Sequence, residues 1–357
     1  MVGIIIESLL GLGFTYLLIN RIPYVLNYFQ ETTFKRYSRI SNTKKRKDTP
    51  FPKEKVSSFS DKELREIICK IEKTFNQKDL NNFHYNIKNL KVRLSNNLND
   101  EVSIPVVGVV EGCYDVKRNQ ITLLKERKMD NVLSHEVMHL ASSRNNGLIK
   151  KPYMGFLRED ILSSSFGFGL NEGYTEYLTN YLTKSTTYSS YIFEQIVARS
   201  IEDIVGKEEM RSLYLNSDLK GLYDKLSKYY SKEEIDHLLI SLDNICRFGD
   251  VNSSEESLRN LKYRSYEYIA TLLHKGLLLK MNEEIYSGNS IRRYFTDLNN
   301  VIEGIEYRQN PRYNKIINTI RDKQLEVYTF LSQGDINVGF DDLSTHKEYS
   351  IKKKVRK

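Results

Sequence analysis

The first strongly apolar stretch of the chain runs from Val2 to Asn20 and is interrupted only by Glu7 and Ser8. A helix needs about 20 apolar residues to cross the hydrocarbon core of a bilayer, so this run is just long enough. A basic segment follows it, and by the positive-inside rule such a flank stays in the cytoplasm. The pattern predicts a single-pass anchor in the cell membrane over residues 1–22, with the body of the protein in the cytoplasm. A buried or interfacial helix is the alternative, because Glu7 is costly in lipid.

The polar stretch after the anchor predicts a connection to a folded domain. Residues 41–58 hold two prolines and almost no apolar periodicity, which is typical of a linker. We therefore interpret residues 23–58 as a basic juxtamembrane segment that ends in a linker. Ser60 and Glu63 then form a capping-box pattern, which predicts that a helix opens there and continues through residues 61–76.

The remaining apolar pattern predicts a small sheet followed by many helices. Short stretches rich in β-branched residues, bounded by polar residues, predict strands at 90–95, 102–110 and 119–124. After Met129, nearly the whole pattern up to about Phe330 predicts helix with polar breaks. These elements together predict an α+β fold. One domain is expected over residues 59–340, followed by a basic tail over residues 341–357.

Composition and charge narrow the classes of function. The chain has 357 residues, 40% of them apolar, which is enough to bury a sizeable core. Its net charge of +8 comes from the basic segment 35–47 and the tail 347–357, so the rest of the chain is mildly acidic. A basic face for nucleic acid is therefore not expected. The three cysteines are widely spaced without a CxxC pair, so they suggest neither a disulfide framework nor a cysteine zinc site, and we interpret them as buried or incidental thiols in a reducing compartment.

The stretch "SHEVMHLASS", residues 134–143, carries the strongest chemical signal. On a helix, His135 and His139 project from the same side one turn apart, so both imidazoles can bind a single ion. Glu136 is rotated by about 100° and can reach a water beside that ion. The pattern is HExxH, in which the two histidines bind zinc and the glutamate acts as a general base. An ordinary helix with two histidines is the alternative.

The flanks of this motif favour the metal site. A helical wheel places Leu133, Val137, Leu140 and Ala141 on one apolar arc, with both histidines outside it. Downstream, "GLNEGYTEYLTNYLTK" brings Glu172 and Glu176 to one helix face. One of these carboxylates can supply the third protein ligand, and the other can accept a hydrogen bond from a ligating imidazole. Two solvated glutamates on an amphipathic helix are the alternative.

The stretches 132–141 and 171–176 together resemble the zincin metallopeptidases, and more narrowly the gluzincin branch that includes thermolysin, zinc aminopeptidases and anthrax lethal factor. The resemblance covers about residues 104–182 and implies a zincin-like catalytic core. It implies that Glu172 is the third zinc ligand and that Glu176 orients a histidine. "SYEYIATLL" is similar to the YExG segment of zinc aminopeptidases, which implies that Tyr266 stabilises the oxyanion, although Ile269 replaces the family glycine.

Two further features bear on the substrate. The stretch 108–124 resembles the sheet edge along which zincins bind an extended peptide. The gap between His139 and Glu172 is longer than in thermolysin, and this insertion is expected to form a lid or a cleft wall.

These expectations combine into a membrane-anchored metallopeptidase with one Zn²⁺ that acts on a peptide or protein substrate. Zinc held by His135, His139 and Glu172 polarises the scissile carbonyl and activates a water, while Glu136 takes the proton from that water. The alternative is a non-catalytic, membrane-associated binding or regulatory protein that retains a zincin fold. The presence of Glu136 favours the enzyme, because a purely structural metal site needs the histidines but not the base.

Overall fold

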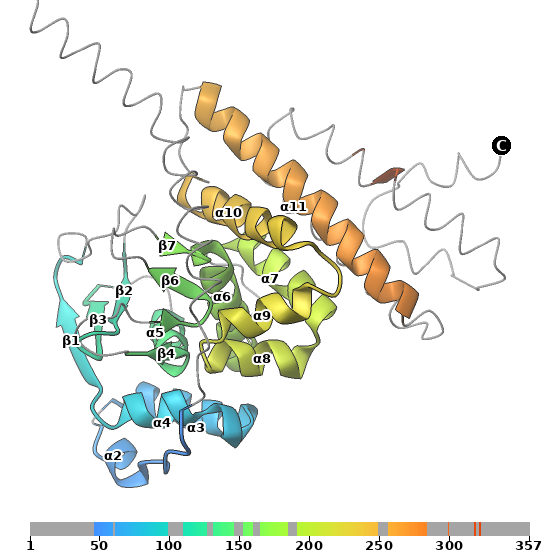
Figure 1. Cartoon of the computed structure of the whole chain (residues 1–357). Coiled ribbons are helices and arrows are strands. Elements are labelled where there is room, and N and C mark those ends of the chain that lie inside the picture. The colour runs from blue at the N-terminus through green and yellow to red at the C-terminus, as the bar shows by residue number, and fades with distance from the viewer. Residues whose placement is uncertain are drawn as a thin grey trace, which may run out of the picture.

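The computed structural model describes residues 46–59, 61–98, 110–126, 131–145, 153–159, 165–184, 191–248 and 256–283, with residues 299, 318, 321 and 322. Their fold is α+β, mainly helical with two small sheets, as the sequence predicts. The first helices lie at one end of the molecule and the last two helices at the opposite end, with the sheets between them (Figure 1). The predicted anchor, the segment 23–45, the strand at 102–109 and the tail 341–357 lie outside the described residues.

The N-terminal helices are α2 (Lys53–Ser57), α3 (Lys62–Thr74), the short 3-10 helix η1 (Gln77–Asp79) and α4 (Asn81–Ile87). The N-cap of α3 is Asp61, one residue later than the predicted Ser60, because the extended backbone of Asp61 lets its carboxylate accept a hydrogen bond from Leu64 N at 3.2 Å. Part of the predicted linker is also ordered. Val56 of α2 is buried, so this helix packs against the domain.

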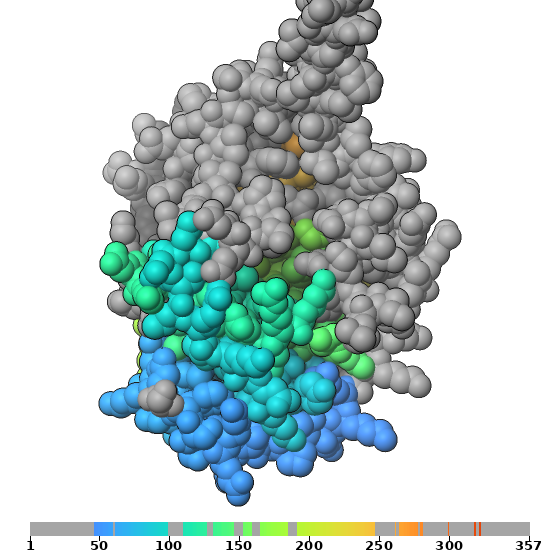
Figure 2. Space-filling view, turned by 90° about the vertical axis from the view of Figure 1, so that its left-hand side faces the viewer, coloured from blue at the N-terminus to red at the C-terminus, as the bar shows by residue number. Residues whose placement is uncertain are grey.

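A three-stranded sheet forms from β1 (Lys91–Ser95), β2 (Gly112–Asp115) and β3 (Gln120–Leu124), in the order β1-β3-β2. β3 is parallel to β1 and antiparallel to β2. Two of these strands match predicted ones. In β3 the three consecutive residues Ile121, Thr122 and Leu123 are all buried, so both faces of this strand are covered. In Figure 2 the sheet and the N-terminal helices form adjoining parts of one face.

The prediction that nearly everything after Met129 is helical is wrong for the described residues 143–145, 153–159 and 165–166. This stretch holds four short antiparallel strands, β4 (Ser143–Arg144), β5 (Tyr153–Met154), β6 (Leu157–Glu159) and β7 (Ser165–Phe166). They form a second sheet in sequence order. Strands of two or three residues are too short to show a period-2 pattern, which explains why the sequence conceals them.

Helix α5 (Val132–Ala141) contacts the three-stranded sheet on one side and α6 (Phe168–Thr183) on the other. Figure 1 shows it between these two elements. The four residues of its predicted apolar arc are all fully buried, with 0% exposure: Leu133, Val137, Leu140 and Ala141. The C-terminal end of α5 is fixed by Asn86 of α4, whose Nδ2 donates to Leu140 O at 2.9 Å.

The position of α6 depends on a residue far away in the sequence. Asp243 accepts hydrogen bonds from the backbone N–H groups of Gly167 (2.9 Å) and Gly169 (2.8 Å), which satisfies donors at the first turn of α6. Gly167 has a φ of 75°, in the left-handed region that favours glycine. Gly173 lies so near α7 that a Cβ there would be 2.3 Å from Glu194 O. Glycine in this motif therefore allows close helix packing.

The C-terminal half is helical, as predicted, and comprises α7 (Ile192–Val205), α8 (Lys207–Leu215), α9 (Leu219–Leu226), α10 (Lys232–Phe248) and α11 (Glu256–Glu283). Helix α6 contacts both α7 and α10, and α11 packs on α7 and α10. One continuous apolar core joins these helices to the N-terminal ones. Among the helices of the described ranges, none combines the length and the apolar character needed to cross a bilayer.

Candidate metal centre

Three side-chain atoms converge where α5 meets α6. His139 Nε2 lies 3.0 Å from His135 Nε2, and each of these nitrogens lies 3.4 Å from Glu172 Oε2. Atoms that bind one ion tetrahedrally at about 2.0–2.1 Å are about 3.3–3.4 Å apart, so this triangle has nearly the size of one face of such a site. The three residues form a group that could hold a metal ion.

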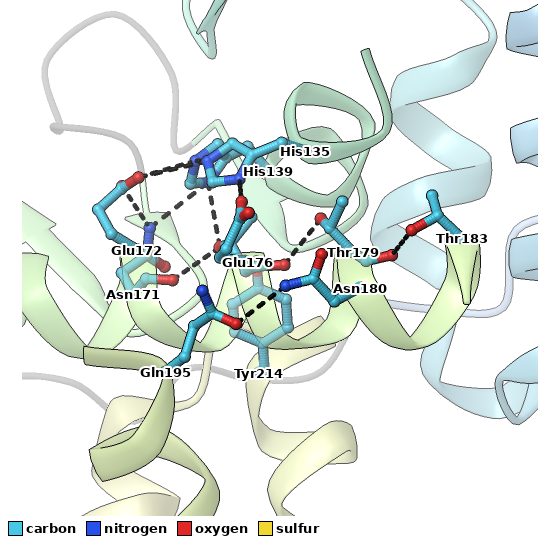
Figure 3. A network of polar contacts seen from close by, with 11 residues as sticks. His135, His139, Asn171, Glu172, Glu176, Thr179, Asn180, Thr183, Gln195 and Tyr214 are labelled. Carbon is cyan, nitrogen blue, oxygen red and sulfur yellow. Dashed lines mark hydrogen bonds and ion pairs between the residues drawn. The ribbon is translucent and has the colours of Figure 1, made fainter. Parts of the chain in front are cut away.

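Burial distinguishes these groups from ordinary surface residues. His139 is 5% exposed, Glu172 6% and Glu176 4%, which contradicts the reading of the two glutamates as a solvated helix face. Figure 3 shows Glu172 pointing toward both imidazoles from its place on α6. Buried charges of this kind are found in proteins where they are paired or coordinate a metal.

The carboxylate of Glu176 contacts an imidazole of the candidate metal centre. Its Oε2 is 2.7 Å from His135 Nδ1, on the side of the ring away from the converging atoms (Figure 3). A proton on Nδ1 donated to Glu176 leaves the Nε2 lone pair of His135 free for a cation. This contact supports the predicted orienting role of Glu176.

The ring of His139 is contacted by two residues that the sequence reasoning did not single out for this purpose. Asn171 Nδ2 lies 3.5 Å and Thr175 Oγ1 3.4 Å from His139 Nδ1. Thr175 Oγ1 in turn lies 2.6 Å from Tyr214 Oη. Asn171 and Thr175 could have been found from their positions one residue before each glutamate. Tyr214 on α8 could not, because only tertiary packing brings it here.

Glu136 occupies a buried position beside strand β2 and is 6% exposed. β2 comes so close that a Cβ on Gly112 would lie 3.0 Å from Glu136 Cγ and 3.1 Å from its Oε1. Burial raises the pKa of Glu136, while electrostatic interaction with His139 and His135 and a hydrogen bond from the Tyr114 backbone act in the opposite direction. A raised pKa makes a carboxylate a better proton acceptor once it is ionised.

Where α5 meets α6, the pKa values of His135 and Glu172 are shifted by the neighbouring histidines and glutamates. Burial alone would lower the pKa of His135, but hydrogen bonds with Glu172 and Glu176 outweigh it and raise that pKa well above its ordinary value. Burial alone would raise the pKa of Glu172, but the two histidines bring it well below its ordinary value. The carboxylates therefore favour positive charge at this position, which a divalent cation would supply.

The predicted oxyanion residue, Tyr266, lies on α11 and is fully buried in the apolar core. Its ring packs edge to face on Phe193, with 4.6 Å between centroids. Tyr191 is the tyrosine whose ring stacks beside the site, 6.4 Å from the His135 ring. Its pKa is raised well above the ordinary value by burial and then by the charge of Glu172. No sequence motif distinguishes Tyr191 from the other tyrosines among the 25 of the chain.

Tyr191 has a φ of 55°, in the left-handed region that is uncommon for a bulky residue. It is the N-cap of α7, the helix packed along α6. Strained backbone of this kind is enriched at functional sites.

Comparisons of the chain with protein-family models, with curated proteins and with solved structures give no match.

Proposed function

We propose that this protein is a zinc-dependent metallopeptidase with a zincin-like catalytic core of the gluzincin type. The triangle formed by His135, His139 and Glu172 is the observation that carries the proposal, because its edges suit a four-coordinate ion with one position left open. Two imidazoles and one carboxylate suit zinc better than magnesium or calcium, which prefer oxygen ligands. Glu136, buried next to these ligands, supplies the base that a structural site does not need.

The residues of the chain have separate roles in this proposal. Bound zinc would polarise the scissile carbonyl and lower the pKa of a water. Glu136 accepts the proton of that water and passes it to the leaving amine. Strand β2 lies close to Glu136, so a peptide bound beside this sheet, as the resemblance to zincins implies, would lie near the base. Tyr191, in place of Tyr266, donates a hydrogen bond to the developing oxyanion.

The activity is tested with the full chain and a broad peptide library whose products are identified by mass spectrometry. We expect cleavage with bound zinc, loss of cleavage with a chelator, and recovery when zinc is restored. Glu136→Gln keeps the size and the metal ligands, so we expect it to retain zinc and to lose turnover. A protein that binds zinc but cleaves nothing under these conditions would instead be the non-catalytic binding protein.

The choice between the two tyrosines has a matched test. Tyr191→Phe and Tyr266→Phe each remove one hydroxyl and keep the ring. We expect Tyr191→Phe to lower kcat about 100-fold, the order of magnitude for loss of one oxyanion donor, with zinc affinity unchanged. Tyr266→Phe should leave kcat near the wild-type value. The reverse order would return the oxyanion role to Tyr266.

A further inference from the structure

The imidazole of His139 needs a defined tautomer if its Nε2 is to bind a metal. With the Nε2 lone pair directed at the ion, the ring proton must lie on Nδ1, and a buried N–H needs an acceptor. His135 solves the same problem with Glu176. No carboxylate contact to His139 Nδ1 occurs among the described residues, so the acceptor must be one of its two neutral neighbours, Asn171 or Thr175.

Asn171 is excluded as this acceptor by its own hydrogen bonds. Its Oδ1 accepts from Phe156 N at 3.2 Å, which identifies the atom nearer to His139 as the amide nitrogen. That nitrogen is a donor, and it also lies 3.4 Å from Glu172 Oε1. An amide nitrogen cannot accept the proton of His139 Nδ1.

Thr175 has the required acceptor. It is fully buried, and its hydroxyl donates to Asn171 O at 2.7 Å, which directs the oxygen lone pairs away from that carbonyl. Tyr214 Oη lies 2.6 Å from Thr175 Oγ1, and because the threonine proton is already used, the tyrosine is the donor. One lone pair of Oγ1 then remains for His139 Nδ1 at 3.4 Å. This distance is long for a hydrogen bond, so the contact mainly fixes tautomer and orientation.

We propose that Thr175, held by Tyr214, is the positioning residue for His139: it keeps the ring proton on Nδ1 and so leaves Nε2 for the metal. The inference rests on the proposed metal site but not on peptidase activity. It gives the two histidines different supports. His135 is held by a carboxylate, whereas His139 is held by a neutral hydroxyl relay that joins α6 to α8.

The test compares three variants of the full chain by zinc titration against a competing chelator. Thr175→Val removes the hydroxyl at nearly constant volume, and we expect zinc affinity to fall about 10- to 100-fold, as for other residues that orient metal ligands. Thr175→Ser keeps the hydroxyl and should retain near wild-type affinity. Thr179→Val is the matched control, because Thr179 lies one turn later, is fully buried, and donates to Thr175 O at 2.8 Å.

A spectroscopic measurement makes the test independent of folding losses. In the zinc-loaded protein, the ¹⁵N chemical shifts of His139 should show a proton on Nδ1, and Tyr214→Phe should weaken zinc binding less than Thr175→Val does. The proposal is overturned if Thr175→Val binds zinc like the wild type, or if Thr179→Val loses as much affinity. If the wild-type protein does not bind zinc at all, the proposed metal site itself is refuted. If Thr175→Val does not fold, Tyr214→Phe and Thr175→Ser still decide the question.

Discussion

Glu172 and Glu176 lie one turn apart on α6, yet their carboxylates contact different atoms of His135. Glu172 Oε2 is 3.4 Å from Nε2, on the side where the ligand atoms converge, and Glu176 Oε2 is 2.7 Å from Nδ1, on the opposite side. The first contact suits a metal ligand and the second an orienting acceptor. The role expected of each glutamate therefore depends on which nitrogen of the His135 ring its carboxylate faces.

Substitution of each glutamate by glutamine should separate these two roles. Glu176→Gln keeps an acceptor for His135 Nδ1, so we expect zinc affinity to fall no more than about 10- to 100-fold. Glu172→Gln removes one of three ligands and should leave the site almost empty, as should His135→Ala and His139→Ala. Equilibrium titration against a chelator measures both glutamine variants. If Glu176→Gln proves the weaker binder, the two roles are exchanged.

Gly112 controls the distance between β2 and the proposed base. A Cβ at this position would lie 2.5 Å from Val132 Cγ1 and 3.0 Å from Glu136 Cγ. We expect Gly112→Ala to move the strand or to rotate Glu136, at a cost of about 1–3 kcal/mol, and to reduce turnover while zinc stays bound. Gly221→Ala, at a crowded glycine of α9, is the control for overpacking. Equal turnover in both variants would contradict this role for Gly112.

At the scale of elements, α6 is fixed by partners on three other helices. α10 caps its first turn through Asp243, α7 packs against Gly173, and α8 reaches it through Tyr214 and Thr175. Because α6 carries Glu172 and Glu176, the geometry of the site depends on the whole helical half. A shift of α6 along α5 would move Glu172 away from the two histidines, so the candidate metal centre depends on how these two helices are aligned.

Removal of the Asp243 cap should loosen α6. Asp243→Ala leaves the N–H groups of Gly167 and Gly169 without their acceptor, and each buried unsatisfied donor costs about 1–3 kcal/mol. We expect a lower denaturant midpoint and weaker zinc binding together. Asp224→Ala, which breaks only an exposed pair with Lys220, is the control and should change stability little. A stable Asp243→Ala protein would show that α6 does not need this cap.

The junction of α10 with α11 should respond to pH. Lys275 Nζ lies 2.7 Å from Glu234 Oε1, and this hydrogen bond lowers the pKa of Glu234. A lowered folded-state pKa stabilises the fold above the unfolded value of about 4.3, and this contribution is lost as pH falls through the folded value. We expect Glu234→Gln to cost about 0.2–1 kcal/mol near neutral pH and almost nothing in acid.

Denaturant unfolding of the wild type and the variant across this pH range measures the difference. Glu233→Gln, at an exposed position in the same turn, is the control. A cost of Glu234→Gln that does not change with pH would show that the ion pair is not its source.

At the scale of the whole molecule, the candidate metal centre lies between the N-terminal part and the helical half. The three-stranded sheet and α3 contact α5, whereas α7 and α10 contact α6. Zinc held across α5 and α6 would therefore link the two parts of the core. Ligand binding to the folded state alone adds to stability, so zinc removal should lower the unfolding temperature.

Attachment to the membrane is the prediction that concerns the whole chain. We expect full-length protein to sediment with membranes and to resist low-salt extraction, because an apolar run of this length can span a bilayer and each basic residue near anionic lipid adds about 1 kcal/mol. Removal of residues 1–22 should release it. Protease added outside intact cells should leave the body undigested. Soluble full-length protein at low salt, or digestion from outside, would refute the anchor.

Local spacing in the sequence determined the core of the site. His135, Glu136 and His139 lie on one helix, and helix geometry alone places the two histidines on the same side. The apolar arc of that helix follows from side-chain periodicity, and the strands β1 and β3 follow from β-branched stretches bounded by polar residues; both signals are local. The start of α3 was predicted to within one residue, since Ser60 and Asp61 are both good caps and sequence alone does not choose between them.

Only tertiary structure decided the remaining partners. The approach of Gly112 to Glu136, the cap that Asp243 provides for α6, and the relay from Tyr214 through Thr175 to His139 join segments far apart in the sequence. The stacking of Tyr191 beside His135 is another contact between residues far apart in the sequence. These contacts depend on how the helices and strands pack together. Tertiary packing produces no periodic pattern in the sequence, so the contacts could not be predicted from it.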